Sequence, residues 1–129
     1  MNIPQELRYT KEHEWVLLDD GVAIVGITDF AQAELGDIVY VELPTIGASL
    51  ATTEAFGNVE SVKSVSDLYA PISGVVADIN TRLADSPETM NTDPYGEGWL
   101  LRLDPKDAGE VNQLLTAKEY GEYIGAEAE

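Results

Sequence analysis

The sequence predicts a mainly β fold, a sandwich or flattened barrel with short helices at its periphery. Short apolar segments are separated by turn residues, helical periodicity is brief, and no low-complexity linker divides the chain. A length of 129 residues suits a single domain over residues 1–129. Hydrophobic residues make up 44% of the chain, so a core can form despite the formal net charge of −17.

The first predicted elements are two strands over Glu12–Leu18 and Val22–Gly26. Apolar and β-branched residues dominate both segments, as is typical of strands. The segment Asp19–Gly21 separates them, and its aspartates and glycine tolerate a positive φ angle. We therefore expect an N-terminal β-hairpin.

A short helix and a third strand are predicted next. Thr28 can cap a helix over Asp29–Leu35, and Gly36 can end it in the left-handed αL conformation. A strand over Ile38–Leu43 then ends at Pro44, because proline has no N–H to donate to a sheet.

The remaining strands follow from the same pattern of apolar runs between turn residues. They are expected over Leu50–Val62, Val65–Ala70, Gly74–Ile79 and Trp99–Leu103. Ser86–Gly98 contains two prolines and two glycines, which predicts a loop.

The C-terminal segment Asp107–Ile124 has apolar residues at helical spacing. We expect two short helices, interrupted near Leu115 and Thr116. The last residues, Gly125–Glu129, are expected to be frayed and exposed to solvent.

Composition excludes several classes of function. Seven Lys and Arg face 24 Asp and Glu, so the chain lacks the cationic surface that binds nucleic acid. It has no cysteine, which excludes disulfides, thiolate metal sites and a cysteine nucleophile. No apolar run approaches the length of a membrane span, and the N-terminus has no targeting pattern. These features favour a cytoplasmic protein that binds neither membrane nor nucleic acid.

Histidine and the large aromatic side chains are expected to serve the structure. His13 is the only histidine, and a lone histidine in a strand is more often packed or hydrogen-bonded than catalytic. Trp15, Phe56 and Trp99 are more often core residues than docking residues at such positions.

Lys63 is the residue most suggestive of function. It is one of four lysines, and it lies at the predicted tip of a hairpin. If the chain reverses at Lys63 and Ser64, Glu60 faces Asp67 and Val59 faces Leu68. Tight hairpins prefer Asn-Gly or Asp-Gly at the tip, and opposed carboxylates repel, so turn stability does not explain these residues. A lysine held on a rigid protrusion suits a modifying enzyme, although a solvated surface lysine is the alternative.

Acidic residues offer two further interpretations. Paired carboxylates could serve a small hydrolase, and the candidate pairs are Glu12 with Glu14 and Glu60 with Asp67. No phosphate loop, catalytic triad or metal cluster supports that chemistry. Asp104, Asp107 and Glu110 lack the spacing of an EF-hand, so they are expected to form a solvated acidic face, with no metal site. A third possibility is an acidic scaffold that only binds partners.

From about Tyr9 to Ile124 the sequence resembles the H-protein family of the glycine cleavage system. Five stretches carry the resemblance in the same order: Tyr9–Val16, Gly26–Gln32, Leu35–Pro44, Phe56–Gly74 and Pro94–Leu100. Ser64 departs from the family, in which alanine is common at this position. Biotin carriers place their lysine between two methionines. The lipoyl domains of 2-oxo-acid dehydrogenases more often have the sequence Asp-Lys-Ala. The Val-Lys-Ser sequence around Lys63 therefore favours the glycine cleavage system.

The resemblance implies a barrel-sandwich hybrid of the lipoyl and biotinyl carrier type, with the lipoyl lysine at a hairpin tip. It implies lipoate joined to Lys63 through an amide, on a carrier that is not itself catalytic. The lipoylating enzyme, a ligase or a lipoyl or octanoyl transferase, is expected to depend on Glu60 and Gly74.

The resemblance also implies three partner enzymes. A pyridoxal-phosphate glycine decarboxylase loads the arm with an aminomethyl group, a tetrahydrofolate-dependent aminomethyltransferase unloads it, and the flavoenzyme dihydrolipoamide dehydrogenase reoxidises it. We expect a monomer that docks transiently and is steered to basic surfaces by its charge. Because the loaded group is labile when its nitrogen is neutral, we further expect its ammonium to lie near Glu14 or Asp67.

Overall fold

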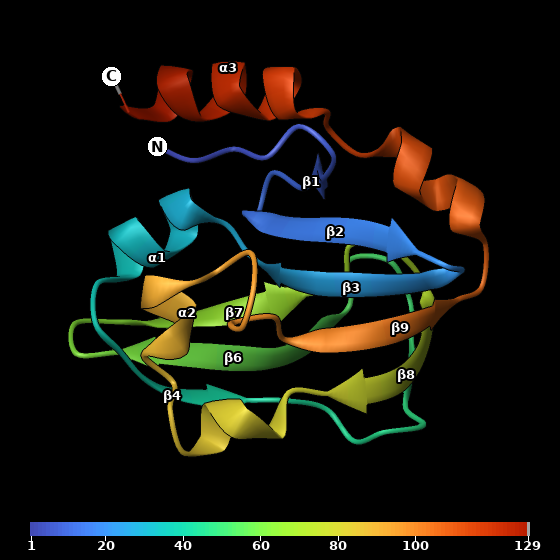
Figure 1. Cartoon of the computed structure of the whole chain (residues 1–129), viewed down its shortest axis with the longest axis horizontal. Coiled ribbons are helices and arrows are strands. Elements are labelled where there is room, and N and C mark those ends of the chain that lie inside the picture. Colours follow the sequence, from blue (N-terminus) through green and yellow to red (C-terminus); the bar gives the residue numbers. More distant parts are fainter. Residues whose placement is uncertain (129) are drawn as a thin grey trace.

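The computed structural model describes the backbone of residues 1–128 and the side chains of residues 1–125. Its strands form two antiparallel sheets, one of six strands in the order β1-β2-β3-β9-β8-β5 and one of three in the order β4-β6-β7 (Figure 1). The strands are β1 (Arg8–Tyr9), β2 (Glu14–Asp19), β3 (Val22–Ile27), β4 (Ile38–Glu42), β5 (Ser49–Leu50), β6 (Ala55–Ser61), β7 (Val65–Tyr69), β8 (Gly74–Ile79) and β9 (Leu101–Pro105). The helices are α1 (Asp29–Leu35), α2 (Thr89–Thr92) and α3 (Ala117–Ala128), and the 3-10 turns are η1 (Thr81–Ala84) and η2 (Ala108–Gln113). The predicted mainly β class is confirmed.

The N-terminal hairpin forms as the turn chemistry predicts. Strands β2 and β3 pair from Glu14 with Ile27 to Asp19 with Val22. The two residues between them, Asp20 and Gly21, have φ angles of 51° and 82°. Aspartate and glycine both tolerate this region, so the two-residue turn closes without strain.

Helix α1 begins at its predicted cap and ends in a different conformation. The hydroxyl of Thr28 accepts a hydrogen bond from the amide of Ala31 at 3.1 Å. Gly36 ends the helix with φ 76° and ψ −154°, outside the predicted αL region. Essentially only glycine adopts a positive φ angle with an extended ψ angle. Glycine is therefore required at position 36 for this conformation and not for the αL conformation that the sequence predicts.

Several strand ends differ from their predicted positions by one or two residues, and three predicted elements differ more substantially. The long strand over Leu50–Val62 is interrupted, because a turn at residues 51–54 separates β5 from β6. Thr53 in this turn has a φ angle of 70°. The predicted loop at Ser86–Gly98 contains α2, and the last strand is shifted to Leu101–Pro105. The ends of strands, turns and loops depend on contacts with distant residues, and the local sequence does not reveal these contacts.

Apolar side chains pack in two clusters. The larger fills the space between the two sheets and includes Val25, Val59 and Leu103. The smaller lies under α3, where the ring of Tyr120 stacks on that of Tyr9 at 4.6 Å between centroids. This packing holds α3 beside the N-terminal segment along the top of Figure 1.

The C-terminal segment forms two helical pieces, η2 and α3, separated near Leu115 as predicted. Helix α3 continues to Ala128, past the predicted end at Ile124. Residue 129 and the side chains of residues 126–129, which belong to the tail expected to be frayed, lie outside the described residues. No helix in the described part of the chain is long and apolar enough to cross a membrane.

Candidate functional site

Lys63 lies in the loop of the β6–β7 hairpin, which projects at the left of Figure 1. The backbone N–H of Ser61 donates to the carbonyl of Ser64 at 2.8 Å, which leaves Val62 and Lys63 as a two-residue tip. The hydroxyl of Ser61 accepts hydrogen bonds from the amides of Ser64 at 3.1 Å and Lys63 at 3.4 Å. The sequence has no Asn-Gly or Asp-Gly pair at this turn, and the hydroxyl of Ser61 stabilises the turn by accepting hydrogen bonds from its amides.

The predicted register of this hairpin is wrong by two residues. Glu60 pairs with Val65, and Asp67 pairs with Asn58, so Glu60 and Asp67 do not face each other. The two-residue tip is formed by Val62 and Lys63, one position earlier than the expected tip of Lys63 and Ser64, and Ser61 closes it. The carboxylate pair Glu60 and Asp67, proposed for hydrolase chemistry, is therefore not an opposed pair.

The root of the tip is fixed to the segment that follows α1. The amide of Val62 donates to the carbonyl of Asp37 at 3.0 Å. The side chain of Asn91 in α2 donates to the carbonyl of Gly36 at 2.8 Å, which holds that segment in place. The stem of Lys63 lies over Gly36, since a Cβ atom built there would be 3.5 Å from Lys63 Cε. Nothing in the sequence singled out Asn91, because its partners are remote in the chain.

A cleft of about 460 Å³ lies at the other end of β7. Four segments of the chain line it, and its lining residues are Tyr9, Thr10, Lys11, Glu12, Glu14, Thr52, Thr53, Tyr69, Ala70, Pro71, Gln113, Leu114 and Leu115. Its volume lies in the range of ordinary small-ligand pockets. Strand β7 therefore connects the lysine tip with a cleft large enough to hold a ligand.

Glu14 is the buried acid of this cleft, with 1% of its surface exposed. Its Oε1 accepts from the hydroxyl of Thr10 at 2.6 Å, and its Oε2 accepts from the amide of Tyr69 at 3.2 Å. Burial raises the pKa of Glu14 to about 7, although these two hydrogen bonds act to lower it; the nearby charge of Glu12 raises it slightly further. The carboxyl group therefore changes charge near neutral pH.

The other acids of the sequence lie in different environments. Glu12 lines the same cleft but is exposed, so it does not form a buried carboxylate pair with Glu14. Asp67 is exposed on β7 and is not among the lining residues. Glu60 is half-buried on β6, three residues before Lys63. Of the two acids expected near a folded-back arm, the structure brings only Glu14 to a cleft.

Glu110 differs from the other two acids of the predicted acidic face because its carboxylate is held by hydrogen bonds. Its carboxylate accepts two hydrogen bonds from Ser73 and one from Thr52, whereas Asp104 and Asp107 are exposed. Within the described residues, no group of three His, Cys, Asp or Glu side chains is placed to hold a metal ion.

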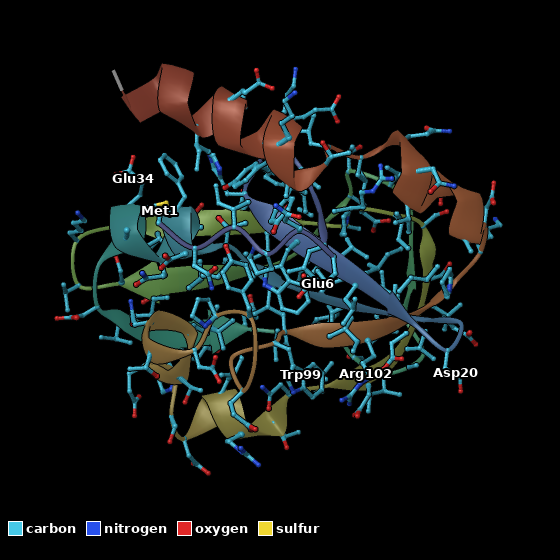
Figure 2. All side chains as sticks on the ribbon, turned by 45° about the horizontal axis from the view of Figure 1, so that its top comes forward. Met1, Glu6, Asp20, Glu34, Trp99 and Arg102 are labelled. Atoms are coloured by element: carbon cyan, nitrogen blue, oxygen red, sulfur yellow. The ribbon has the colours of Figure 1, made fainter. Side chains whose placement is uncertain are left out.

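The histidine and two of the three aromatic residues have the structural roles expected, although His13 lies just before β2 and not in the strand. His13 Nδ1 is 2.9 Å from the hydroxyl of Tyr120, and its ring packs on Phe30. Trp15 and Phe56 are buried. Trp99 is only half-buried, and the guanidinium of Arg102 lies 4.1 Å from its ring centre. Both side chains are labelled in Figure 2. Trp99 was expected in the core, and its ring is instead covered in part by the guanidinium of Arg102 in a cation–π contact.

Gly74 is expected to matter for the lipoylating enzyme. It is buried in β8 of the six-stranded sheet, whereas Lys63 belongs to the β6–β7 hairpin of the three-stranded sheet. A Cβ atom at Gly74 would lie 2.6 Å from the backbone oxygen of Asp104. We expect Gly74→Ala to destabilise the chain by about 1–3 kcal/mol, because β8 must move from β9. Urea unfolding measures this cost, with Gly125→Ala as the control, since a Cβ there meets no atom within 4 Å. Loss of lipoylation without loss of stability would contradict this account.

Comparison with known proteins supports one family across almost the whole chain. The family model described as "Glycine cleavage H-protein" matches residues 7–127. A glycine cleavage system H protein of Chlorobium phaeobacteroides is 59% identical over 128 residues, covering 98% of this chain and 100% of that protein. The corresponding protein of Bacillus subtilis is 54% identical over 122 residues, covering 95% and 96%.

A solved structure agrees with the sequence comparison. The crystal structure of a glycine cleavage system H protein from Mycobacterium marinum superposes with a TM-score of 0.88 at 45% identity. It covers 95% of this chain, and this chain covers 99% of it. The hairpin lysine, the cleft and the two-sheet fold thus occur in a chain that belongs to the glycine cleavage H-protein family.

Proposed function

We propose that Lys63 carries the lipoyl group of this H-protein and that the Glu14 cleft shelters the loaded arm. The observation that carries the first part is the position of Lys63 at the tip of a hairpin whose amides and root are hydrogen-bonded. The other three lysines lie elsewhere: Lys11 before β2, Lys106 after β9 and Lys118 in α3. An acylating enzyme must reach the lysine Nζ, and a protruding tip leaves it accessible.

Membership of the family defines the role of the chain. It is a carrier component of the glycine cleavage system, is not itself catalytic, and belongs to a family that carries a lipoyl-lysine. When bound, a lipoyl group supplies a disulfide that accepts the aminomethyl unit of glycine and is restored by reoxidation. The system implies the decarboxylase, the aminomethyltransferase and the dihydrolipoamide dehydrogenase as partners.

The oligomeric state of the chain, the enzyme that attaches the lipoyl group and the way the chain meets its partners are further parts of the proposal. We propose that the chain is a monomer that docks transiently, and that a ligase or a lipoyl or octanoyl transferase modifies Lys63. The net charge of −17 supports electrostatic steering to basic surfaces around the partners' active sites. A cytoplasmic location of the protein stays a prediction.

Intact-mass measurement tests the attachment site in a chain produced with lipoate and its attaching enzyme. We expect one lipoyl increment, and peptide mapping is expected to place it on Lys63. An increment on Lys11, Lys106 or Lys118 would overturn the assignment.

The Glu14 cleft fits the loaded arm by charge and by shape. A buried carboxylate next to an ammonium group stabilises the protonated amine and becomes more acidic itself, because each charge favours the other. The apolar part of the cleft, which includes Pro71 and Leu115, can cover methylene groups and exclude water. Asp67 is exposed, so solvent screens its charge and it supports the loaded state much less.

The lifetime of the aminomethyl-loaded chain distinguishes the two acids. We expect Glu14→Gln to shorten it by about tenfold or more, because the amine loses a partner in a buried site. Asp67→Asn, the matched control, is expected to leave it close to that of the parent. The measurement is the release of formaldehyde and ammonia from the isolated loaded chain at pH 7.5. Equal lifetimes for the parent and Glu14→Gln would exclude the cleft as the shelter and leave the assignment of Lys63 unaffected.

A further inference from the structure

Glu110 joins segments that are far apart in the chain. Its Oε1 accepts from the amide of Ser73 at 3.0 Å and from the hydroxyl of Ser73 at 2.6 Å. Its Oε2 accepts from the hydroxyl of Thr52 at 2.9 Å. Ser73 is 37 residues from Glu110 in sequence, and Thr52 is 58 residues away. Hydrogen bonds to a carboxylate are among the stronger kinds, so one side chain links three segments.

These three segments are walls of the cleft around Glu14. Thr52 itself lines the cleft with Thr53. Ser73 follows the lining segment Tyr69–Pro71 by two residues, and Glu110 precedes the lining segment Gln113–Leu115 by three. We propose that Glu110 is a positioning residue that holds these three walls together and thereby keeps water from the buried carboxyl group of Glu14. The part of this role that concerns the loaded arm rests on the proposed function.

The wall formed by the turn at residues 51–54 needs such support. Thr53 has a φ angle of 70°, an unfavourable conformation for a β-branched residue that persists only where surrounding contacts hold it. Its amide donates to the carbonyl of Ala70 at 2.8 Å, and the side chain of Thr52 is held by Glu110. The strained turn is thus fixed on one side by backbone and on the other by the carboxylate of Glu110.

The chemistry of Glu110 agrees with a permanent contact. The hydrogen bonds from Ser73 and Thr52 lower its pKa, so the carboxylate is ionised at neutral pH and keeps all three bonds. The fourth wall, which carries Glu14, is held independently: Tyr9 and Leu115 exchange backbone hydrogen bonds of 2.8 and 2.9 Å, and Glu14 itself binds the amide of Tyr69.

Two measurements on the chain without lipoate test the proposal. Carboxyl NMR titration follows Glu14, whose pKa of about 7 arises mainly from burial. In Glu110→Ala we expect this pKa to fall toward its ordinary value of 4.5, because water enters the opened cleft. Amide hydrogen exchange at Thr53 is expected to become about tenfold faster or more.

Two variants separate positioning from general stability. Glu119→Ala removes an acid that also accepts hydrogen bonds, but from Thr116 at the start of α3, and it should change neither measurement. Glu110→Gln keeps an acceptor for Ser73 and should lie between Glu110→Ala and the parent. If the Glu14 pKa and the exchange rate of the Thr53 amide are the same in Glu110→Ala as in the parent, the proposal is wrong.

The loaded chain provides a third measurement that separates this proposal from the shelter itself. We expect Glu110→Ala to shorten the lifetime of the loaded group by a smaller factor in a Glu14→Gln background than alone, because both changes act on one cleft. A lifetime that responds to Glu14→Gln and not to Glu110→Ala would overturn the role of Glu110. A lifetime that responds to neither would overturn the shelter, while the titration and exchange results would still decide whether Glu110 holds the walls.

Discussion

Lys63→Arg is expected to give a chain that folds normally and takes up no lipoyl group, so transfer through the glycine cleavage system stops. Arginine keeps the positive charge and the long stem, but its guanidinium stays protonated at any accessible pH and does not accept an acyl group. Lys63 is exposed, so the substitution should cost little stability. Intact mass, thermal unfolding and glycine-dependent NADH formation with the three partner enzymes measure these outcomes.

The matched control for this substitution is Lys118→Arg in α3, an exposed lysine away from the hairpin. It should be lipoylated fully and support transfer at the rate of the parent. A lipoylated Lys63→Arg chain would show that the lipoyl group is attached elsewhere.

Glu14→Gln is expected to remove a pH dependence of stability. Burial raises the pKa of Glu14 from 4.5 to about 7, so the folded state binds its proton more tightly than the unfolded state does. The resulting stabilisation is fully present below pH 4.5 and is lost as the pH rises through 7. From the size of the shift, the loss is about 3 kcal/mol. Glutamine cannot ionise, so the variant does not share this loss.

The quantity to compare is the difference in unfolding free energy between Glu14→Gln and the parent. Urea titrations from pH 4 to pH 8 should show that this difference moves in favour of the variant by about 3 kcal/mol. Glu12→Gln is the control, because Glu12 lies in the same cleft but is exposed and should show much less change. A constant difference across this range would mean that Glu14 has an ordinary pKa in the folded chain.

Features that depend on neighbouring residues could be predicted from the sequence. The Asp20 and Gly21 turn and the Thr28 cap of α1 each depend on groups within a few residues, and both are found where expected. The hairpin that carries Lys63 could also be predicted, because its segment has the pattern of two strands around a turn. Its register could not, since the sequence accommodates a two-residue turn at Lys63 and Ser64 as well as one at Val62 and Lys63.

Features that depend on distant residues could not be predicted. The hydrogen bonds of Glu110 could not be predicted, because Ser73 and Thr52 are 37 and 58 residues away in the chain. The same holds for Asn91, whose partner Gly36 is 55 residues away. Glu14 was named as one of two candidates, but its burial and raised pKa follow from segments that only the fold brings together.

The hydrogen bond between Val62 and Asp37 has a consequence for how the arm is handed over. With the lipoyl group on Lys63, as proposed, this bond would give the arm a fixed pivot, and the free end would meet the cleft at an effective concentration on the order of millimolar. A weak contact with Glu14 then suffices to keep the arm docked. The same weak contact lets a partner enzyme remove the arm quickly, because no tight bond must first be broken.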